Sequence, residues 1–311
     1  MSDDQMIPAD PAELRKPAEC RPERVRELAA ELAAGRRLPE LEPLFAALPH
    51  SATGPEAELR ACVLGELSLR GVPWRQRPAL VAYAERLREA GHPLARLPET
   101  RLDVEHRFGA RARGAGPVRS AGRLRARFPE VPDSERGAAA GRAAREAPDA
   151  ARSRAAAGAF TAGGWACAPE ARFFTLAQPL AADDFGMSFL KELPLDCLAG
   201  EVGPGGLPAC VTAADDALNE LYSAAAVGGV NGHPLHGAYA RLHAWQGLYA
   251  LLDLPAETPF LEAVRYAAGC RWLRFMAFTR WFRHDTADVG LAVLDPSGTR
   301  VSVLAATDTD D

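Results

Sequence analysis

The chain has 311 residues, of which 48% are hydrophobic, and a formal net charge of -5 at pH 7. That length suits about two domains with buried cores, and the negative charge argues against nonspecific binding of the whole chain to nucleic acid or acidic membranes. The sequence contains no run of roughly 18 uncharged apolar residues, and the start, MSDDQMIPAD, is acidic where a signal peptide is basic and then apolar. We therefore expect a cytoplasmic protein without a membrane span.

The six cysteines are scattered and form no CxxC pair. This spacing predicts neither a disulfide framework nor a zinc site. Reduced, mostly buried thiols are the expected state.

Residues 1–100 are predicted to form a helical region. Apolar residues recur at helical spacing over 24–34, 55–71 and 78–90. Thr53 and Glu56 have the spacing of a capping box for the second helix, with Pro55 in its first turn. Successive short helices favour an antiparallel array, which presents extended surfaces, so a protein partner is expected to bind through this region.

Residues 101–158 differ in composition. Between 101 and 154 there are thirteen Arg, no Lys and seven Asp or Glu, with few large apolar residues. Such a segment buries too little surface to offset the entropy of ordering, so a disordered linker is predicted. It is either an arm with weak affinity for nucleic acid or an acidic partner, or a compositional or coding bias; the lack of interleaved aromatic residues favours the second interpretation.

Residues 159–311 are predicted to form an α+β domain, which makes the whole chain α+β. The pattern indicates a strand over 171–180, a second strand or a short mixed element over 185–198, and then three helices ending near 228, 252 and 270. An aromatic strand follows from Trp272. The chain then forms a β-hairpin whose Asp-Pro-Ser-Gly turn requires a positive φ at Gly298. Its second strand, Val301 to Ala306, is expected to pair inside the sheet.

The loop from Gly228 to His236 is the strongest candidate site. Its glycines, followed by a helix N-terminus, would let the backbone approach a ligand closely. His233 and His236 could act as general bases or metal ligands. The spacing of His236 and His243 is too long for chelation from one helix, which favours structural roles for these histidines.

Carboxylates form a second candidate group. Asp308 and Asp310, if extended, point to the same side of a strand and could share a divalent cation with Asp288. The alternative is that these groups are simply solvated. No cofactor is predicted.

Motifs of nucleophilic catalysis or nucleotide binding are absent from the sequence. The aromatic residues between Trp272 and Phe282 fit either a stacking platform or a core strand, and the core interpretation is favoured.

The C-terminal half carries the succession GGxxGxxxxGAYARLHAWQ, CRWLRF, WF and DVGLAVLDPSGTRVSVLAATDTD. Over residues 172–310 it resembles an actinobacterial family, a domain of unknown function, that ends in LAATDTD. The family pattern has an aromatic residue where this chain has Ala287. The resemblance implies a domain and a lineage but no reaction.

These patterns together favour a non-catalytic binding or regulatory protein. The alternative is an enzyme whose pocket lies between the Gly228–His236 loop and the C-terminal Asp residues. A divalent metal is one option for its cofactor. The enzyme hypothesis requires that four residues line one pocket: His233, His236, Asp288 and Asp308. The binding hypothesis does not require this.

Overall fold

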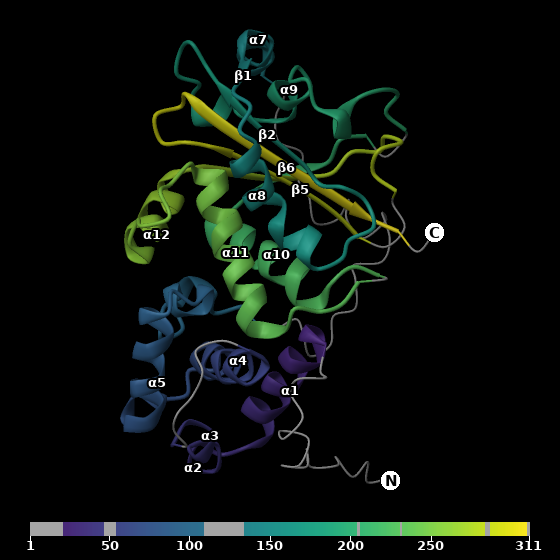
Figure 1. Cartoon of the computed structure of the whole chain (residues 1–311). Coiled ribbons are helices and arrows are strands. Elements are labelled where there is room, and N and C mark those ends of the chain that lie inside the picture. The colour runs from purple at the N-terminus through teal and green to yellow at the C-terminus, as the bar shows by residue number, and fades with distance from the viewer. Residues whose placement is uncertain are drawn as a thin grey trace, which may run out of the picture. The chain divides into compact units, whose positions relative to one another are not determined.

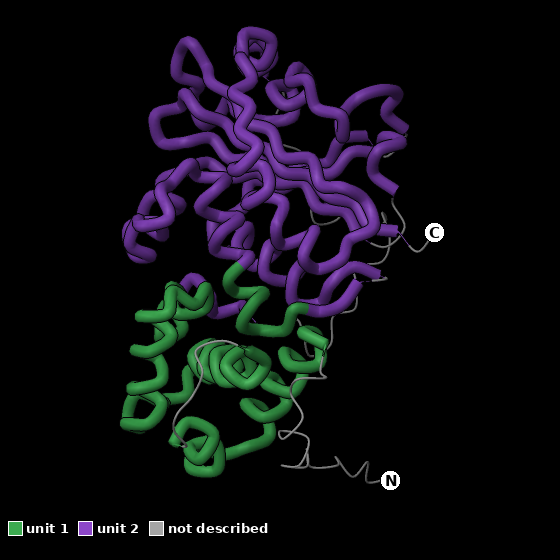
Figure 2. The backbone as a smooth tube through the Cα atoms, in the orientation of Figure 1, with its two compact units in different colours: residues 1–102, 235–242 green, residues 103–234, 243–311 purple. Residues whose placement is uncertain are grey.

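The computed structural model describes residues 21–46, 54–108, 134–203, 206–230, 232–283 and 287–309. The chain divides into two compact units (Figure 2): unit 1 comprises residues 1–102 and 235–242, and unit 2 comprises residues 103–234 and 243–311. Helix α11, His236–Leu252, gives its first residues to unit 1 and the rest to unit 2. The predicted α+β class is confirmed. None of the helices in the described ranges has the length and apolar character needed to cross a membrane.

Unit 1 is helical, as predicted. Each of its three longer helices has a proline in the first turn, where the missing N–H is no loss. Gly54 precedes the longest of them, whereas Thr53 of the predicted capping box lies outside the described residues. The elements are α1 Pro22–Gly35, α2 Leu38–Leu41, α3 Pro43–Ala46, α4 Pro55–Leu69 and α5 Pro78–Glu89, with 3-10 turns η3 Trp74–Gln76 and η4 Pro93–Arg96.

The start of α11 packs closely on α4 within unit 1. A Cβ atom added to Gly65 would lie 2.7 Å from Cβ of Ala238, and one added to Gly237 would lie 2.7 Å from both carboxylate oxygens of Glu66. Glu66 is buried and accepts a hydrogen bond of 2.9 Å from the backbone N–H of Ala238. A carboxylate thus occupies the positive end of the helix dipole of α11.

Unit 2 is built on a six-stranded antiparallel sheet in the order β1-β2-β6-β5-β4-β3. The central strand, β6, pairs with β2 on one side and β5 on the other, so the prediction that this segment lies inside the sheet is confirmed. The strands are β1 Arg145–Glu146, β2 Glu170–Thr175, β3 Ala209–Thr212, β4 Arg271–Phe275, β5 Ala287–Leu294 and β6 Arg300–Asp308.

Helices and turns cover both faces of this sheet (Figure 1). One face bears α8 Ala150–Ala162, α10 Ala214–Val227, the later part of α11, and α12 Phe260–Gly269. The other bears α7 Glu135–Ala143, α9 Met187–Leu190 and the 3-10 turns η6 Ala182–Asp184 and η7 Asp196–Leu198. Double coverage explains why β6 is buried at every position after Arg300 instead of alternating.

The prediction of a disordered linker over residues 101–158 was wrong for part of that range. Residues 109–133 lie outside the described residues, but 134–158 contain α7, β1 and most of α8, and a 3-10 turn, η5, spans Asp103–Glu105. Small residues provide the packing that the composition hid: Gly137 and Gly141 lie where a Cβ would clash with the backbone carbonyls of Asp184 and Phe189. Close approach of backbones replaces large apolar side chains in this segment.

The segment 185–198 forms α9 and η7, so it is the short mixed element and not a second strand. The three helices predicted after it are α10, α11 and α12. β3 ends at Thr212, and Ala213 is the residue before α10.

The C-terminal hairpin and the aromatic segment are confirmed. Gly298 has φ of 72° in the turn between β5 and β6. Trp272, Phe275 and Phe282 are buried in the core of unit 2, which agrees with the core interpretation of the aromatic run.

Candidate functional site

The glycine-rich loop after α10 packs against another loop of the chain, in unit 2. The backbone N–H of Gly229 donates a 2.8 Å hydrogen bond to the carbonyl of Gly163, and a Cβ atom on Gly232 would collide with that same oxygen. Trp165 follows in the opposing loop and donates its indole N–H to the carbonyl of Ala224. The glycines therefore permit the close backbone approach that the sequence predicts, and a loop of the chain itself makes that approach.

Asp308 holds these two loops together. Its Oδ1 accepts a 2.8 Å hydrogen bond from the backbone N–H of Ala166, and its Oδ2 accepts a 2.6 Å bond from that of Val230. The residue is 2% exposed. Both carboxylate oxygens are thus hydrogen-bonded to backbone, which is how a buried charge is compensated.

Asp288 is placed differently from Asp308. It lies opposite Thr307 in the β5–β6 pairing, and the Thr307 hydroxyl donates a 2.6 Å hydrogen bond to its Oδ1. Successive residues of a strand point to opposite faces, so Asp288 and Asp308 lie on different faces of the sheet. The structure therefore separates the two carboxylates that the sequence grouped as metal ligands.

The remaining candidate residues are His233, His236 and Asp310, and the two histidines belong to different units. His233 is exposed in unit 2, whereas His236 belongs to unit 1, where burial lowers its pKa. Asp310 lies outside the described residues. Within the described ranges, no group of three or more His, Cys, Asp or Glu side chains is arranged to hold a metal ion.

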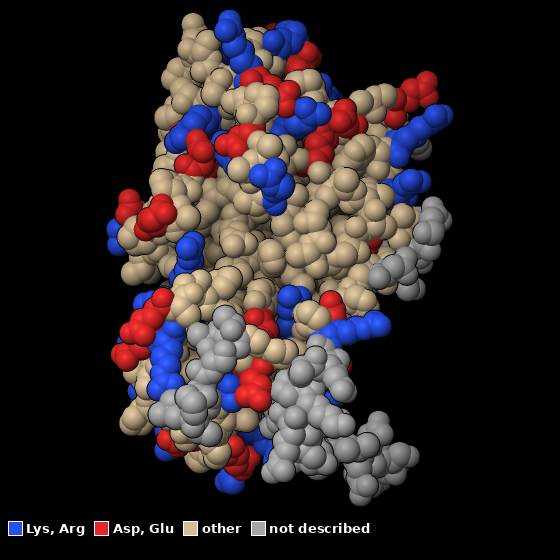
Figure 3. All heavy atoms as spheres, viewed as in Figure 1, with Lys and Arg blue, Asp and Glu red and all other residues tan. Residues whose placement is uncertain are grey.

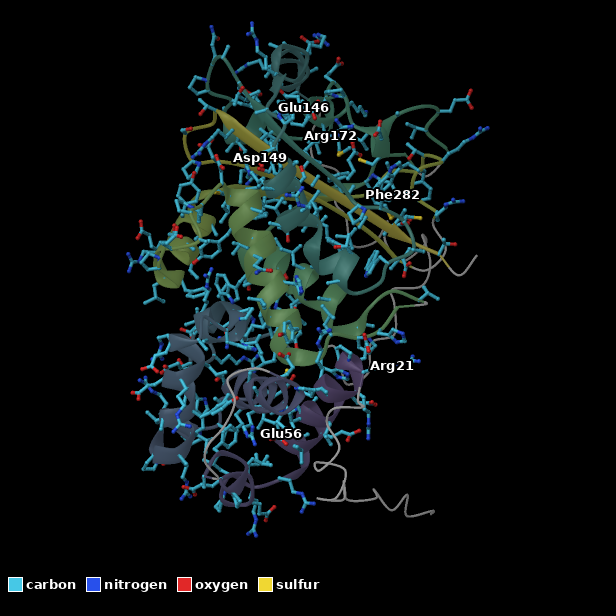
Figure 4. All side chains as sticks on the ribbon, viewed as in Figure 1. Arg21, Glu56, Glu146, Asp149, Arg172 and Phe282 are labelled. Carbon is cyan, nitrogen blue, oxygen red and sulfur yellow. The ribbon has the colours of Figure 1, made fainter. Side chains whose placement is uncertain are left out.

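Arg172 has three carboxylate neighbours at the β1–β2 end of unit 2. Figure 3 shows charged side chains gathered around the β1–β2 end, whereas the surface over α8, α10 and α11 is mostly uncharged. Arg172, labelled with Glu146 in Figure 4, contacts Glu146 at 2.8 Å, Asp196 at 3.2 Å and Glu170 at 3.3 Å. Hydrogen bonding to Glu146 raises the pKa of Arg172. This arrangement links β1, β2 and η7.

A small pocket in unit 2, lined by apolar and charged side chains, lies beside the end of α11. Arg152 donates hydrogen bonds to the carbonyls of Ala250 and Leu251 and to the hydroxyl of Ser302. Arg300 contacts Asp253 at 3.1 Å in the same pocket. A guanidinium on the last carbonyls of a helix is a favourable cap, which gives this pocket a structural role.

Unit 1 contains a pocket that the sequence analysis did not predict. Its cavity volume is about 40 Å³. Apolar and small side chains from α4, η3, α5, η4 and the following turn form most of its wall: Ala61, Leu64, Gly65, Trp74, Ala84, Leu87, Leu94, Ala95, Leu97 and Pro98. Ser68, Arg88, Glu99 and Arg241 complete it.

Hydrogen bonds fix the walls of this pocket. Buried Arg241 donates to the carbonyl of Pro98 at 2.8 Å and to that of Thr100 at 2.9 Å. The indole of Trp74 donates to the hydroxyl of Ser68 at 2.9 Å. The pocket is therefore formed before any ligand arrives.

The rim of the pocket is charged. Glu99 contacts Arg88 at 2.6 Å and Arg75 at 2.9 Å, and both arginine side chains are more than half exposed. Two guanidinium groups thus surround one carboxylate. A signal existed in the sequence: residues 70–101 contain seven Arg, three Glu and no Asp.

A second polar cluster of unit 1 surrounds Glu58. Its Oε2 lies 3.2 Å from Nε2 of His92, and the thiol of Cys62 donates to Oε1 at 3.4 Å. Burial opposes ionisation of Glu58, but hydrogen bonds from His92 and Tyr239 outweigh it and lower the pKa. Burial raises the pKa of Cys62, so this thiol is a weak nucleophile.

The described cysteines, Cys62, Cys167, Cys197, Cys210 and Cys270, are free thiols; Cys62 and Cys197 are buried, whereas the other three are half-buried, so the expectation of mostly buried thiols holds for two of the five. Burial also raises the pKa of Cys197, Cys210 and Cys270.

Comparison of the sequence with known proteins identifies the family of the chain. It matches a family of unknown function, DUF6183, over residues 10–310, and the chain belongs to that family. The match includes the N-terminal helices, which the resemblance over 172–310 did not reach. No curated protein and no solved structure matches the chain.

Proposed function

We propose that this protein is a non-catalytic binding or regulatory protein of the cytoplasm, and that its helical unit 1 binds a protein partner. The observation that supports this role is the preformed pocket between α4, α5 and η4, with its apolar wall and charged rim. Protein interfaces commonly concentrate their binding energy in a few such anchoring pockets surrounded by polar groups.

The roles of the enzyme candidates are consistent with this proposal. Asp308 uses both carboxylate oxygens to connect two loops, and Asp288 accepts a hydrogen bond from Thr307. Both interactions stabilise the sheet and loops of unit 2, which explains these carboxylates without a reaction.

Quantitative capture from the native lysate of the source organism tests the function. The bait is the full chain, compared with Ala84→Phe, which fills the pocket from α5, and with Ala82→Phe, its exposed control on the same helix. We expect at least one protein to be retained by the wild type and by Ala82→Phe and to be reduced at least fivefold by Ala84→Phe.

Two further variants separate this role from an enzyme in unit 2. His233→Ala and Asp288→Asn should leave that capture unchanged, because neither residue belongs to unit 1. If no captured protein distinguishes Ala84→Phe from Ala82→Phe, the proposed role of unit 1 is wrong.

A further inference from the structure

We infer that the unit 1 pocket recognises a protein segment in which a small aliphatic side chain stands next to a carboxylate. This inference rests on the proposed function and specifies the chemistry of its partner. Three features of the pocket carry it: the size of the cavity, the character of the wall and the charge of the rim.

The size of the cavity selects the end of one side chain. Pockets for cofactors and metabolites usually have volumes of about 300–1,000 Å³ and bury most of the ligand. A cavity of about 40 Å³ is far smaller. It suits one anchoring side chain of a larger partner, whose remaining contacts lie outside the cavity.

The wall selects an aliphatic group. The buried side chains of Leu64, Leu87 and Leu94 form apolar parts of the wall. The small side chains of Ala61 and Ala84 leave room between the helices α4 and α5. Ser68 is the main polar side chain inside, and its hydroxyl already donates to the carbonyl of Leu64 and accepts from Trp74. An apolar side chain can therefore enter the pocket without leaving the Ser68 hydroxyl unpaired.

The rim selects a neighbouring carboxylate. Arg75 and Arg88 converge on Glu99, so the local charge is positive. Exposed ion pairs of this kind are worth only about 0–1 kcal/mol, so exchange of Glu99 for a carboxylate of the partner costs little. A cationic neighbour would instead meet a rim whose net charge is positive, because two guanidinium groups surround the single carboxylate of Glu99.

Ligand-observed NMR on the full chain tests the inference with three peptides. They are Ac-Ala-Asp-Val-Ala-NH2, its Asn-Val analogue, which lacks the carboxylate, and its Asp-Gly analogue, which lacks the aliphatic side chain. We expect the first to bind, the second to bind about threefold more weakly, and the third to bind about tenfold more weakly.

Variants place the binding in the pocket. Ala84→Phe and, independently, Ala95→Leu should weaken binding of the Asp-Val peptide at least fivefold, whereas Ala82→Phe should not. Arg88→Gln should abolish the preference for the Asp-Val over the Asn-Val peptide. Far-UV circular dichroism checks that each variant folds.

Isovalerate, a free aliphatic carboxylate, distinguishes a protein partner from a small metabolite. Binding of isovalerate as tight as that of the Asp-Val peptide would overturn the inference in favour of a metabolite. Equal binding of all three peptides, or insensitivity to both Ala84→Phe and Ala95→Leu, would also overturn it. If lysate capture still depends on Ala84 in that case, the proposed function survives and only the partner chemistry is wrong.

Discussion

Asp308, in the central strand of the sheet, accepts a 2.6 Å hydrogen bond from the backbone N–H of Val230, in the loop after α10. The same carboxylate accepts a bond from Ala166 in a second loop. The acidic sequence at the end of β6 and the glycine-rich loop are thus two parts of one structural arrangement.

Replacing this carboxylate should destabilise unit 2. In Asp308→Asn the amide group presents an N–H to one of the two backbone donors, which leaves a buried donor unsatisfied at a cost of about 1–3 kcal/mol. Denaturant unfolding followed by tryptophan fluorescence measures this, because four of the five tryptophans belong to unit 2. Asp183→Asn, at an exposed position, is the control and should change the free energy of unfolding by less than about 0.5 kcal/mol. Equal stability of the two variants would contradict the role of Asp308.

The contact between the two loops predicts a second effect. Gly232→Ala places a methyl group against the carbonyl of Gly163 and should destabilise unit 2 by about 1–3 kcal/mol because the loops must separate. Gly269→Ala, whose Cβ would lie 3.5 Å from Pro296, is the matched control and should be nearly neutral. Thermal unfolding of both variants decides the point, and an unchanged midpoint for Gly232→Ala would exclude the tight contact.

The hairpin turn offers a third test. Gly298 has φ of 72°, and an added Cβ would lie 2.6 Å from the carbonyl of Leu180, so Gly298→Val combines backbone strain with a clash. The expected loss is about 2–4 kcal/mol, more than the 1–3 kcal/mol typical of backbone strain alone. Ser297→Val, at the exposed neighbouring position, is the control for a β-branched residue in the turn, and it loses only the hydrogen bonds of the exposed Ser297 hydroxyl to Asp295 and Thr299. A loss in the control as large as that in Gly298→Val would mean that the effect is not specific to the positive φ of Gly298.

Two glutamates of α4 should give pH dependences of opposite sign. Burial raises the pKa of Glu66 above its usual 4.5, so its contribution to stability is complete below that pH and is lost as pH rises through the folded-state pKa. Glu58 has a lowered pKa, so its contribution is present above 4.5 and is lost as pH falls through the folded-state pKa. The stability difference between wild type and Glu66→Gln should therefore decrease as pH rises above 4.5, whereas that between wild type and Glu58→Gln should decrease as pH falls below 4.5. Denaturant unfolding at a series of pH values measures both stability differences. If both changed with pH in the same direction, the opposite pKa shifts of Glu66 and Glu58 would be wrong.

Local patterns in the sequence predicted local structure well. Prolines in the first turn and the helical spacing of leucines located α4 and α5, and the Asp-Pro-Ser-Gly sequence located the turn at Gly298. Segment 134–158 was misjudged because Gly137 and Gly141 pack through backbone contacts, which hydrophobic composition does not reveal. The strand order was not predictable, because pairing of β2 with β6 is settled by tertiary packing between distant segments.

The candidate site was predicted only in part. The glycines of the loop after α10 indicated a close backbone approach, but no sequence signal identified Gly163 as the group approached. The unit 1 pocket was missed because ordinary core residues from five segments form its wall, and only the arginine excess around Arg88 marked the region.

The position of β6 also bears on how the polypeptide folds as it is synthesised. Phe173 in β2 pairs with Ser302 in β6, so β2 emerges from the ribosome long before its partner strand exists. Until then β2 presents an unpaired edge and two aromatic side chains that are buried in the finished fold, Phe173 and Phe174. Sheets with such distant pairings fold slowly, and their intermediates are prone to aggregate. The sheet of unit 2 therefore cannot be completed, and Phe173 and Phe174 cannot be fully covered, until β6 has been synthesised.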